Sequence, residues 1–277
     1  MKVAVVSSAA LPSPPPLYGG LEMIAFTDAL RLSERHDAVL VAAKGSASSA
    51  DVYCEMFGLK CGFDIVEAFE GGVEGDVSEL LKTIGADVLI DHSWTKAPSR
   101  ALLPSVQVLH GVYKPPHPAP NPAAVSAGHA ALEAGILGVN VKYVYGHLPE
   151  EAYRVGEKEK LVVFLARVSR EKGLHVFLDM CRRLAGEFKC AVMGDDSADP
   201  DYTAEMYSLA KKYGVEWLGL QPHDVKTRVL SRAYAVAVFP QYPYFEVFGL
   251  WALEAMLSGA YVISSPYGAM PEYVVSG

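Results

Sequence analysis

The chain has 277 residues, of which 51% are hydrophobic and 20% charged. These values are typical of a folded protein with a large core and exclude a disordered chain. The formal net charge of -8 gives no basic field for a polyphosphate backbone, so we expect no nucleic-acid partner.

Short β-branched runs alternate with longer helical patterns along the first half of the chain. We predict strands at residues 2–7, 38–43, 87–90, 106–110 and 141–146. This alternation is typical of βαβ units around a parallel sheet. A charged, proline-containing stretch follows at 147–160, and we place the domain boundary there, with one domain at 1–150 and a second at 151–277.

The same alternation begins again after this stretch. Strands are predicted at 161–167, 190–194, 215–219, 235–240 and 260–264, with helices near 172–186, 202–213, 224–233 and 247–258. The sequence therefore predicts an α/β protein with two doubly wound, Rossmann-like domains. We expect ligands beyond the carboxyl ends of the strands, in a cleft between the two sheets.

Two glutamates bracket the start of the last long helix, in the segment EVFGLWALEAMLSG (246–259). Glu246 precedes the helix, and Glu254 lies eight residues later, on the helix itself. Phe248, Gly249 and Leu250 would leave first-turn amides free for a sugar or phosphate oxygen. A carboxylate at Glu254 suits two vicinal ribose hydroxyls. An N-cap glutamate followed by a solvated glutamate is the alternative interpretation of the same spacing.

This segment, together with Gly268, Pro271 and Glu272, resembles the signature of the family 4 glycosyltransferases, which have the GT-B fold and retain anomeric configuration. The resemblance implies that Glu246 contacts the donor sugar and that Glu254 binds the ribose hydroxyls. It implies no metal and no other cofactor, since a nucleotide diphosphate sugar is the donor substrate.

Arg167 ends a predicted strand, and Lys172 stands just before Gly173 and a helix. Two cations at this place suit a diphosphate, although a surface loop with a lysine would look the same. The resemblance implies that both neutralise the leaving diphosphate.

The first domain contributes two further candidates. Gly19 and Gly20 separate the first strand from a helix that we expect near Leu21, where a glycine turn lets backbone approach a ligand. The resemblance places this loop against donor phosphate and acceptor. His110 ends a strand, and the family has a histidine near the reacting carbon after an equivalent strand. Asp91 and His92 end another strand and rank lower.

Other features are interpreted as structural. The DPD at 199–201 resembles a metal-binding DxD, but it directly precedes a helix, where aspartate serves as a cap. We expect the cysteines to be core residues without a metal cluster, and the short apolar start suits a cytoplasmic protein more than a secreted one. The cysteines are Cys54, Cys61, Cys181 and Cys190. No run of about 18 apolar residues is present to cross a membrane, while peripheral contact stays open.

Relatives continue past the Pro-Glu of the signature, so the second domain is expected to lack a C-terminal tail and to self-associate through its last strand. The predicted function is hexosyl transfer from a nucleotide sugar to an unknown glycan, lipid or small-molecule acceptor. The alternatives are a nucleotide-sugar binding protein with little catalysis, or another GT-B enzyme such as an epimerase.

Overall fold

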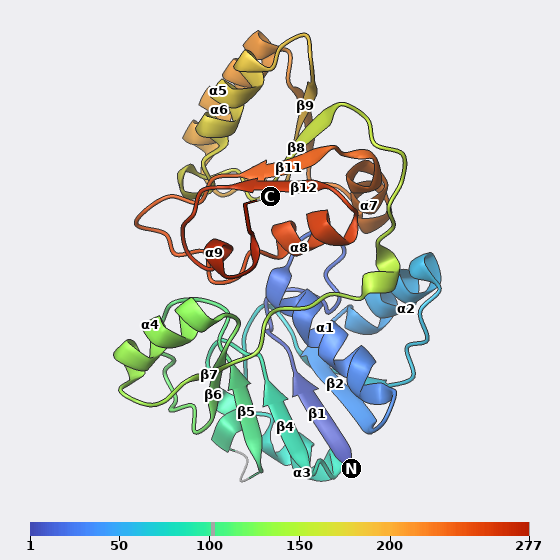
Figure 1. Cartoon of the computed structure of the whole chain (residues 1–277). Helices are drawn as coiled ribbons and strands as arrows, with labels where there is room; N and C mark the ends of the chain where they lie inside the picture. The colour runs from blue at the N-terminus through green and yellow to red at the C-terminus, as the bar shows by residue number, and fades with distance from the viewer. Residues whose placement is uncertain (101–102, 277) are drawn as a thin grey trace. The chain divides into compact units, whose positions relative to one another are not determined.

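The computed structural model describes residues 1–100 and 103–276, and Figure 1 traces the chain through them. The chain divides into two compact units, Met1–Leu148 and Pro149–Gly277. The division falls inside the charged stretch 147–160, which contains only the short 3₁₀ turn Glu150–Ala152 before the next strand begins.

The first unit is built on a parallel sheet of seven strands in the order β3-β2-β1-β4-β5-β6-β7. The chain begins at the central strand β1 and adds strands outward to β3 at one edge. It then returns to the other side of β1 and adds strands outward from β4 to β7, which is the doubly wound arrangement. The strands are β1 Lys2–Val6, β2 Asp37–Ala43, β3 Asp64–Phe69, β4 Val88–Asp91, β5 Ser105–Val108, β6 Pro122–Ala124 and β7 Lys142–Tyr143.

Among the described residues of this unit, four helices connect the strands, and a short 3₁₀ turn covers Ala97–Arg100. The central strands β1 and β2 are almost wholly buried, as expected for a parallel sheet covered on both faces. The helices are α1 Gly20–Ser33, α2 Ser46–Phe57, α3 Ser78–Ile84 and α4 Ala127–Leu137.

The second unit contains a parallel sheet of five strands in the order β10-β9-β8-β11-β12. Here too the order reverses at the centre, between β8 and β11. The strands are β8 Leu161–Leu165, β9 Lys189–Met193, β10 Glu216–Gly219, β11 Ala235–Val238 and β12 Tyr261–Ser264.

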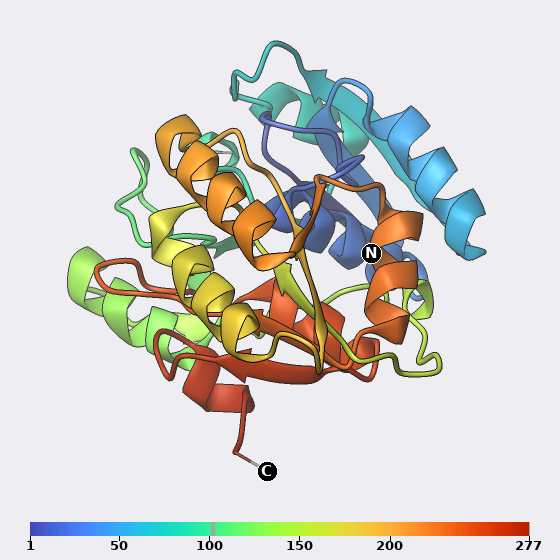
Figure 2. The same ribbon diagram turned by 90° about the horizontal axis from the view of Figure 1, so that it is seen from above.

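Within the described part of this unit, residues 149–276, five helices complete the fold, with a 3₁₀ turn at Arg170–Lys172. Helices α5 and α6 lie side by side in both ribbon views (Figures 1 and 2), and they pack against each other. The helices are α5 Leu174–Arg183, α6 Pro200–Tyr213, α7 His223–Arg232, α8 Leu250–Leu257 and α9 Met270–Tyr273.

The predicted α/β class with two parallel sheets is confirmed, and each of the ten predicted strands is present. Strands β3 and β6 were not predicted, since β3 is mostly solvent-facing at the sheet edge and β6 has only three residues. The predicted helix start near Val247 is wrong. Helix α8 begins at Leu250 because Gly249, with φ 86°, is in the left-handed region.

Asp199 is the N-cap of α6, and its carboxylate accepts from the backbone N–H of Tyr202. This confirms the structural interpretation of the DPD sequence. Cys54, Cys181 and Cys190 are buried, as expected of core residues. The expectation is wrong for Cys61, which is only partly buried and forms a disulfide with Cys54. The chain turns back at Gly58, the left-handed C-cap of α2, and this return brings Cys61 to Cys54.

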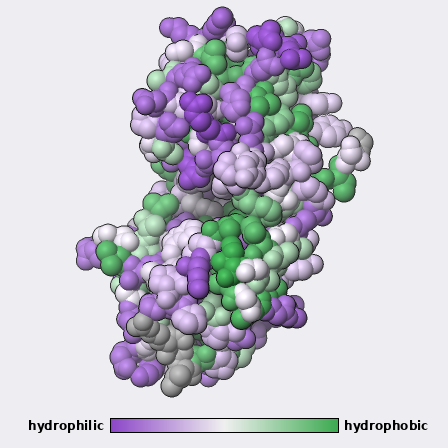
Figure 3. Space-filling view, turned by 90° about the vertical axis from the view of Figure 1, so that its left-hand side faces the viewer, coloured by the Kyte–Doolittle hydropathy of each residue, from purple (hydrophilic) through white to green (hydrophobic). Residues whose placement is uncertain are grey.

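Apolar side chains are also exposed on the first unit. Figure 3 views the side on which α4 lies in Figure 1, and hydrophobic residues gather there over this unit. Exposed apolar side chains on and after α4 include Leu132, Ile136 and Val139. Of the helices within the described residues, none is both long and apolar enough to cross a bilayer. Peripheral membrane contact stays a prediction.

Gly173 joins the Arg170–Lys172 turn to α5 in a conformation that a side chain would disturb. Its φ is 70°, and a Cβ atom would lie 2.3 Å from the backbone oxygen of Phe239. Gly214 has nearly the same φ, 69°, but open space around the missing Cβ. We expect Gly214→Ala to lower the free energy of unfolding by about 1–2 kcal/mol, the cost of the left-handed region.

Gly173→Ala should cost a further 1–3 kcal/mol or so, because Phe239 backbone must also move. Urea unfolding of the two variants measures the difference directly. Equal losses would show that the contact with Phe239 is easily relieved.

Candidate functional site

The second unit brings Lys172 and Glu246 into direct contact. Lys172 ends the 3₁₀ turn after β8, and Glu246 lies in the segment between β11 and α8. The Lys172 Nζ atom is 2.6 Å from Glu246 Oε2, and both side chains are buried. The sequence predicted separate contacts of Lys172 with diphosphate and of Glu246 with sugar, and it did not predict this ion pair.

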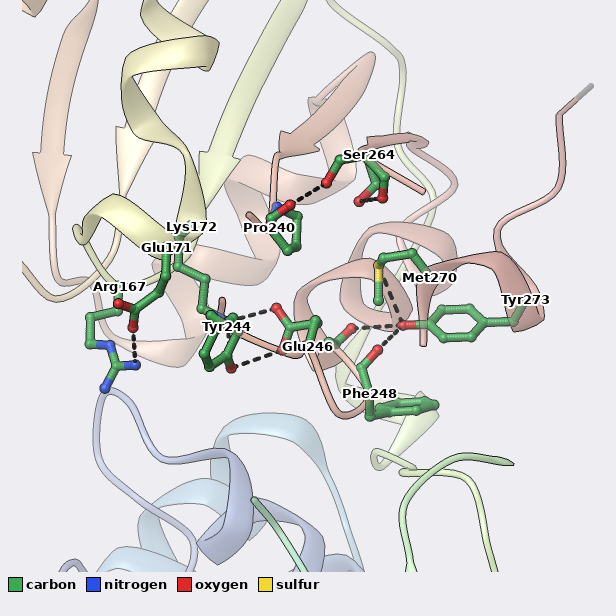
Figure 4. Close-up of polar contacts among 12 residues, drawn as sticks. Arg167, Glu171, Lys172, Pro240, Tyr244, Glu246, Phe248, Ser264, Met270 and Tyr273 are labelled. Atoms are coloured by element: carbon green, nitrogen blue, oxygen red, sulfur yellow. Dashed lines mark hydrogen bonds and ion pairs between the residues drawn. The ribbon is translucent and has the colours of Figure 1, made fainter. Parts of the chain in front are cut away.

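Tyr244 completes the cluster, as Figure 4 shows. Its hydroxyl accepts from Lys172 Nζ at 3.0 Å and donates to Glu246 Oε1 at 3.3 Å. The lysine also lies over the Tyr244 ring, 4.3 Å from its centroid. Burial by itself lowers the pKa of Lys172, but Glu246 and Tyr244 outweigh burial and hold that pKa above its usual value. Lys172 is therefore protonated at neutral pH.

Arg167 follows β8 in the same unit but stands apart from this cluster. It forms an ion pair with Glu171, with 2.9 Å between Nη2 and Oε1 (Figure 4), and both side chains are about one-third exposed. Its Nε atom is buried without a hydrogen-bond partner among the described residues. A buried donor of this kind fits an acceptor supplied by a ligand.

The turn between Glu246 and α8 is held by backbone contacts. A Cβ on Gly268 would lie 2.5 Å from the backbone oxygen of Glu246, and the backbone N–H of Ala269 donates to that oxygen at 2.8 Å. Phe248 is buried and its ring stacks on Tyr273 at 5.1 Å between centroids. The Tyr273 hydroxyl donates to the Phe248 carbonyl (Figure 4). Gly268 and Tyr273 therefore fix the predicted site residues before the helix.

Gly249 is the N-cap residue of α8 and Leu250 is its first residue, so the prediction that Phe248 and Gly249 lie in the first helical turn is wrong. The cap has no side-chain hydrogen bond. The first-turn amides of α8, with the positive end of the helix dipole, are suited to binding an anionic or hydroxyl oxygen. A side chain at position 249 would meet the Met270 methyl at 2.6 Å, so the turn has little room for one.

Glu254 lies on α8 and is buried, with two donors on one carboxylate oxygen. Lys226 Nζ, from α7, is 2.5 Å from Oε1, and the Tyr153 hydroxyl donates to the same atom at 2.9 Å. No hydrogen bond joins Oε2 to the part of the chain that the structure describes. Neither Lys226 nor Tyr153 was predicted, because their link to Glu254 depends on tertiary packing.

In the first unit, Gly19 is the N-cap of α1 and Gly20 is its first residue, one residue earlier than predicted. A Cβ on Gly19 would lie 2.7 Å from Glu22 Oε2. Glu22 is buried and accepts from the Ser8 hydroxyl at 2.5 Å. Burial raises the pKa of Glu22, an effect that the Ser8 hydrogen bond partly offsets. The glycine turn thus makes room for a buried carboxyl that the sequence did not point to.

His110 follows β5 and is joined to His92, which follows β4. His92 Nδ1 and His110 Nε2 are 2.9 Å apart. On the other side of the His92 ring, Nε2 lies 2.9 Å from Asp28 Oδ2, a close contact that is not aligned as a hydrogen bond. Asp28 Oδ1 is 3.0 Å from His147 Nε2. His92, ranked low from the sequence, is therefore a direct partner of His110.

The neighbourhood of His110 also contains a buried lysine. Lys96 is fully buried, and its ammonium donates to the backbone oxygens of Asp91, Ser93 and Val108. Burial lowers the pKa of Lys96 to about 8. Burial, His92 and Lys96 together lower the pKa of His110 well below its usual value, so that ring stays uncharged at neutral pH.

The described residues, 1–100 and 103–276, contain no group of three or more His, Cys, Asp or Glu arranged to hold a metal ion.

Comparison with known proteins gives a family match over the second unit. Residues 150–277 match the family described as Glycosyl transferases group 1. Sucrose synthase 2 of Oryza sativa subsp. japonica is 30% identical over 145 residues, covering 46% of this chain and 18% of that protein. An uncharacterized glycosyltransferase of Methanocaldococcus jannaschii is 27% identical over 122 residues, 43% of this chain and 30% of that protein. The matches therefore span less than a third of these relatives.

Solved structures match over the whole chain. AviGT4, a glycosyltransferase involved in avilamycin A biosynthesis, has a TM-score of 0.76 and 22% identity, covering 99% of this chain and 81% of that one. HepE of Anabaena, in complex with UDP and glucose, has a TM-score of 0.74 and 19% identity, covering 100% and 84%. At these identities the similarity shows the fold. The chain therefore has the GT-B fold, and its residues 150–277 match the glycosyl transferases group 1 family.

Proposed function

We propose that the chain is a glycosyltransferase that takes a sugar from a nucleoside diphosphate donor bound by the second unit. The observation that carries the proposal is the buried Lys172–Glu246 pair, which lies in the same unit as the uncapped start of α8 and the ribose candidate Glu254. The family match over residues 150–277 supports it, as does the fold shared with a UDP and glucose complex.

Each candidate residue then has a chemical task. Lys172 and Arg167 would stabilise charge on the leaving diphosphate, and Glu246 would accept hydrogen bonds from hydroxyls of the transferring sugar. The amides of Phe248, Gly249 and Leu250 would bind donor oxygens at the positive end of α8.

Glu254 would accept the ribose hydroxyls through Oε2, since Tyr153 and Lys226 already occupy Oε1. In the first unit, Gly19, Gly20 and His110 would contact the acceptor and the transferring sugar. We propose further that transfer of a hexose proceeds with retention and without a metal. The expected cytoplasmic location stays a prediction, and the Cys54–Cys61 disulfide is a bond that a reducing compartment tends to open.

A thermal-shift panel of UDP-, GDP- and ADP-sugars tests the proposal and identifies the base. A ligand at 100 times its dissociation constant stabilises a protein by about 2.7 kcal/mol, so one member of the panel should raise the melting temperature clearly. The UDP-sugars are the expected members, because HepE binds UDP in a shared fold. No shift with any nucleotide sugar would contradict the proposal.

A nucleotide-sugar binding protein with little catalysis is the second candidate. The Lys172–Glu246 pair is buried, and each charge is already neutralised by the other. Such pairs also occur as purely structural features, and this observation favours the binding protein. Donor hydrolysis separates the two, because an enzyme releases nucleoside diphosphate slowly without acceptor and a binding protein does not.

Glu254→Ala should weaken nucleotide binding. Loss of a charge-assisted hydrogen bond costs about 1.5–3 kcal/mol, which corresponds to a roughly 10- to 150-fold higher Kd for the nucleoside diphosphate. Calorimetric titration of UDP measures this, with Glu216→Ala, an exposed glutamate at the start of β10, as the control. An unchanged Kd in Glu254→Ala would refute the ribose assignment.

A further inference from the structure

His110 is the partly exposed end of a short chain of polar side chains in the first unit. Behind it lie the fully buried ring of His92 and then the carboxylate of Asp28, which is shared with His147. The two contacts that link Asp28 to His92 and His92 to His110 are both 2.9 Å. No hydrogen bond links the His110 Nδ1 atom to the residues that the structure describes.

Strand ends fix this arrangement. The backbone N–H of His92 donates to the Val6 oxygen at 2.7 Å, which continues the pairing of β4 with the central strand β1. Lys96 then ties β4 to β5 by donating to carbonyls at the ends of both strands. The two histidines are therefore presented from adjacent, locked strands, and Asp28 approaches from α1.

The carboxylate decides where the protons are. Burial acts to raise the pKa of Asp28, but the contacts of its carboxylate with His147 and His92 outweigh burial and lower that pKa. Asp28 is therefore an anion. The Asp28 anion faces His92 Nε2 at 2.9 Å, and a lone pair on that nitrogen would be repelled by it, so the proton lies on Nε2. When each ring has one proton, His92 Nδ1 has a lone pair and accepts from His110 Nε2. The remaining His110 atom, Nδ1, is then a hydrogen-bond acceptor.

We propose that Asp28 and His92 are positioning residues that hold the His110 proton on Nε2, so that Nδ1 accepts a hydrogen bond from a hydroxyl of the sugar substrate. The substrate part of this inference rests on the proposed function, whereas the position of the proton does not. The same Asp and His arrangement fixes a tautomer in hydrolytic triads, where replacing Asp by Asn leaves the geometry intact but reverses the tautomer.

Other charged and titratable groups lie around Asp28, His92 and His110, but Asp28 is the carboxylate that contacts His92 Nε2. They act on His92 and His110 through space, or share Asp28 with them, and come from several elements of the unit. These groups are Glu22 on α1, Asp91 and Lys96 beside the end of β4, His129 on α4 and His147 after β7, while Glu74 before α3 acts on Glu22 and Lys96. His147 contacts the other oxygen of Asp28, which makes it a matched control.

Long-range ¹H–¹⁵N spectra of histidine-labelled protein at neutral pH test the proposal without any substrate. His110 is assigned from the spectrum of His110→Gln. We expect the Nε2–H tautomer of His110 in the native protein, the same tautomer in His147→Gln, and at least partial conversion to Nδ1–H in Asp28→Asn. An Nδ1–H ring in the native protein, or no change in Asp28→Asn, would overturn the proposal. If Asp28→Asn does not fold, the tautomer of His110 in the spectrum of the native protein decides the proposal by itself.

Turnover tests the substrate contact. Asp28→Asn should lower kcat by on the order of 10²-fold, the range of a misplaced proton in catalysis, and Glu216→Ala, at an exposed position on β10, should leave kcat unchanged. A tautomer change without a kcat effect would refute the contact of Nδ1 with substrate. Absence of any transfer by the native protein would instead count against the proposed function and leave the spectra to decide the proton position.

Discussion

Lys172→Met is expected to lower the rate of sugar transfer by on the order of 10²- to 10³-fold, the usual effect of removing an electrostatic stabiliser of the transition state. Lys172 is buried, cationic and held at 2.6 Å from Glu246. Charge develops on the diphosphate as the sugar leaves, and a desolvated cation stabilises that charge more than a solvated one does. Affinity for the intact donor should change much less than kcat.

The substitution also has a structural cost. Removing one member of a buried ion pair typically destabilises a protein by about 3–5 kcal/mol, because the other charge is left unpaired. Unfolding curves must therefore accompany the kinetics, and Lys211→Met, at an exposed position on α6, is the control. A folded Lys172→Met protein with the native transfer rate would place the diphosphate site elsewhere.

Glu246→Gln should mainly lower turnover, by on the order of 10²-fold, and leave nucleotide affinity nearly intact. Gln keeps the shape of the side chain but loses the charge that accepts from sugar hydroxyls and holds Lys172 in place. Steady-state kinetics with the best donor of the panel, together with calorimetry of UDP, separates the two effects. A large loss of UDP affinity with unchanged kcat would assign Glu246 to the nucleotide instead of the sugar.

Much of the fold could be predicted because the core strands are nearly continuous apolar runs. Strands β1, β8 and β11 are buried almost throughout, and such runs between helical patterns have one common solution, a parallel sheet. The start of α8 could not be predicted as well. Its position depends on the left-handed conformation of Gly249, which the helical pattern of the following residues does not show.

The candidate site was predicted in part. The motif around Glu246 and Glu254 identified single residues, since their types and spacing are local properties of the sequence. Partnerships were not predicted, because Lys172 with Glu246 and Lys226 with Glu254 join segments far apart in the chain. His92 was undervalued for the same reason, since its contact with His110 depends on the pairing of β4 with β5.

Release of nucleoside diphosphate from a nucleotide sugar, followed by ³¹P NMR, tests the central claim most directly. The native protein should convert its preferred donor slowly in the absence of acceptor, and Lys172→Met should do so on the order of 10²- to 10³-fold more slowly. A native protein that binds the donor yet releases no nucleoside diphosphate, with or without candidate acceptors, would contradict the claim that this chain is a glycosyltransferase.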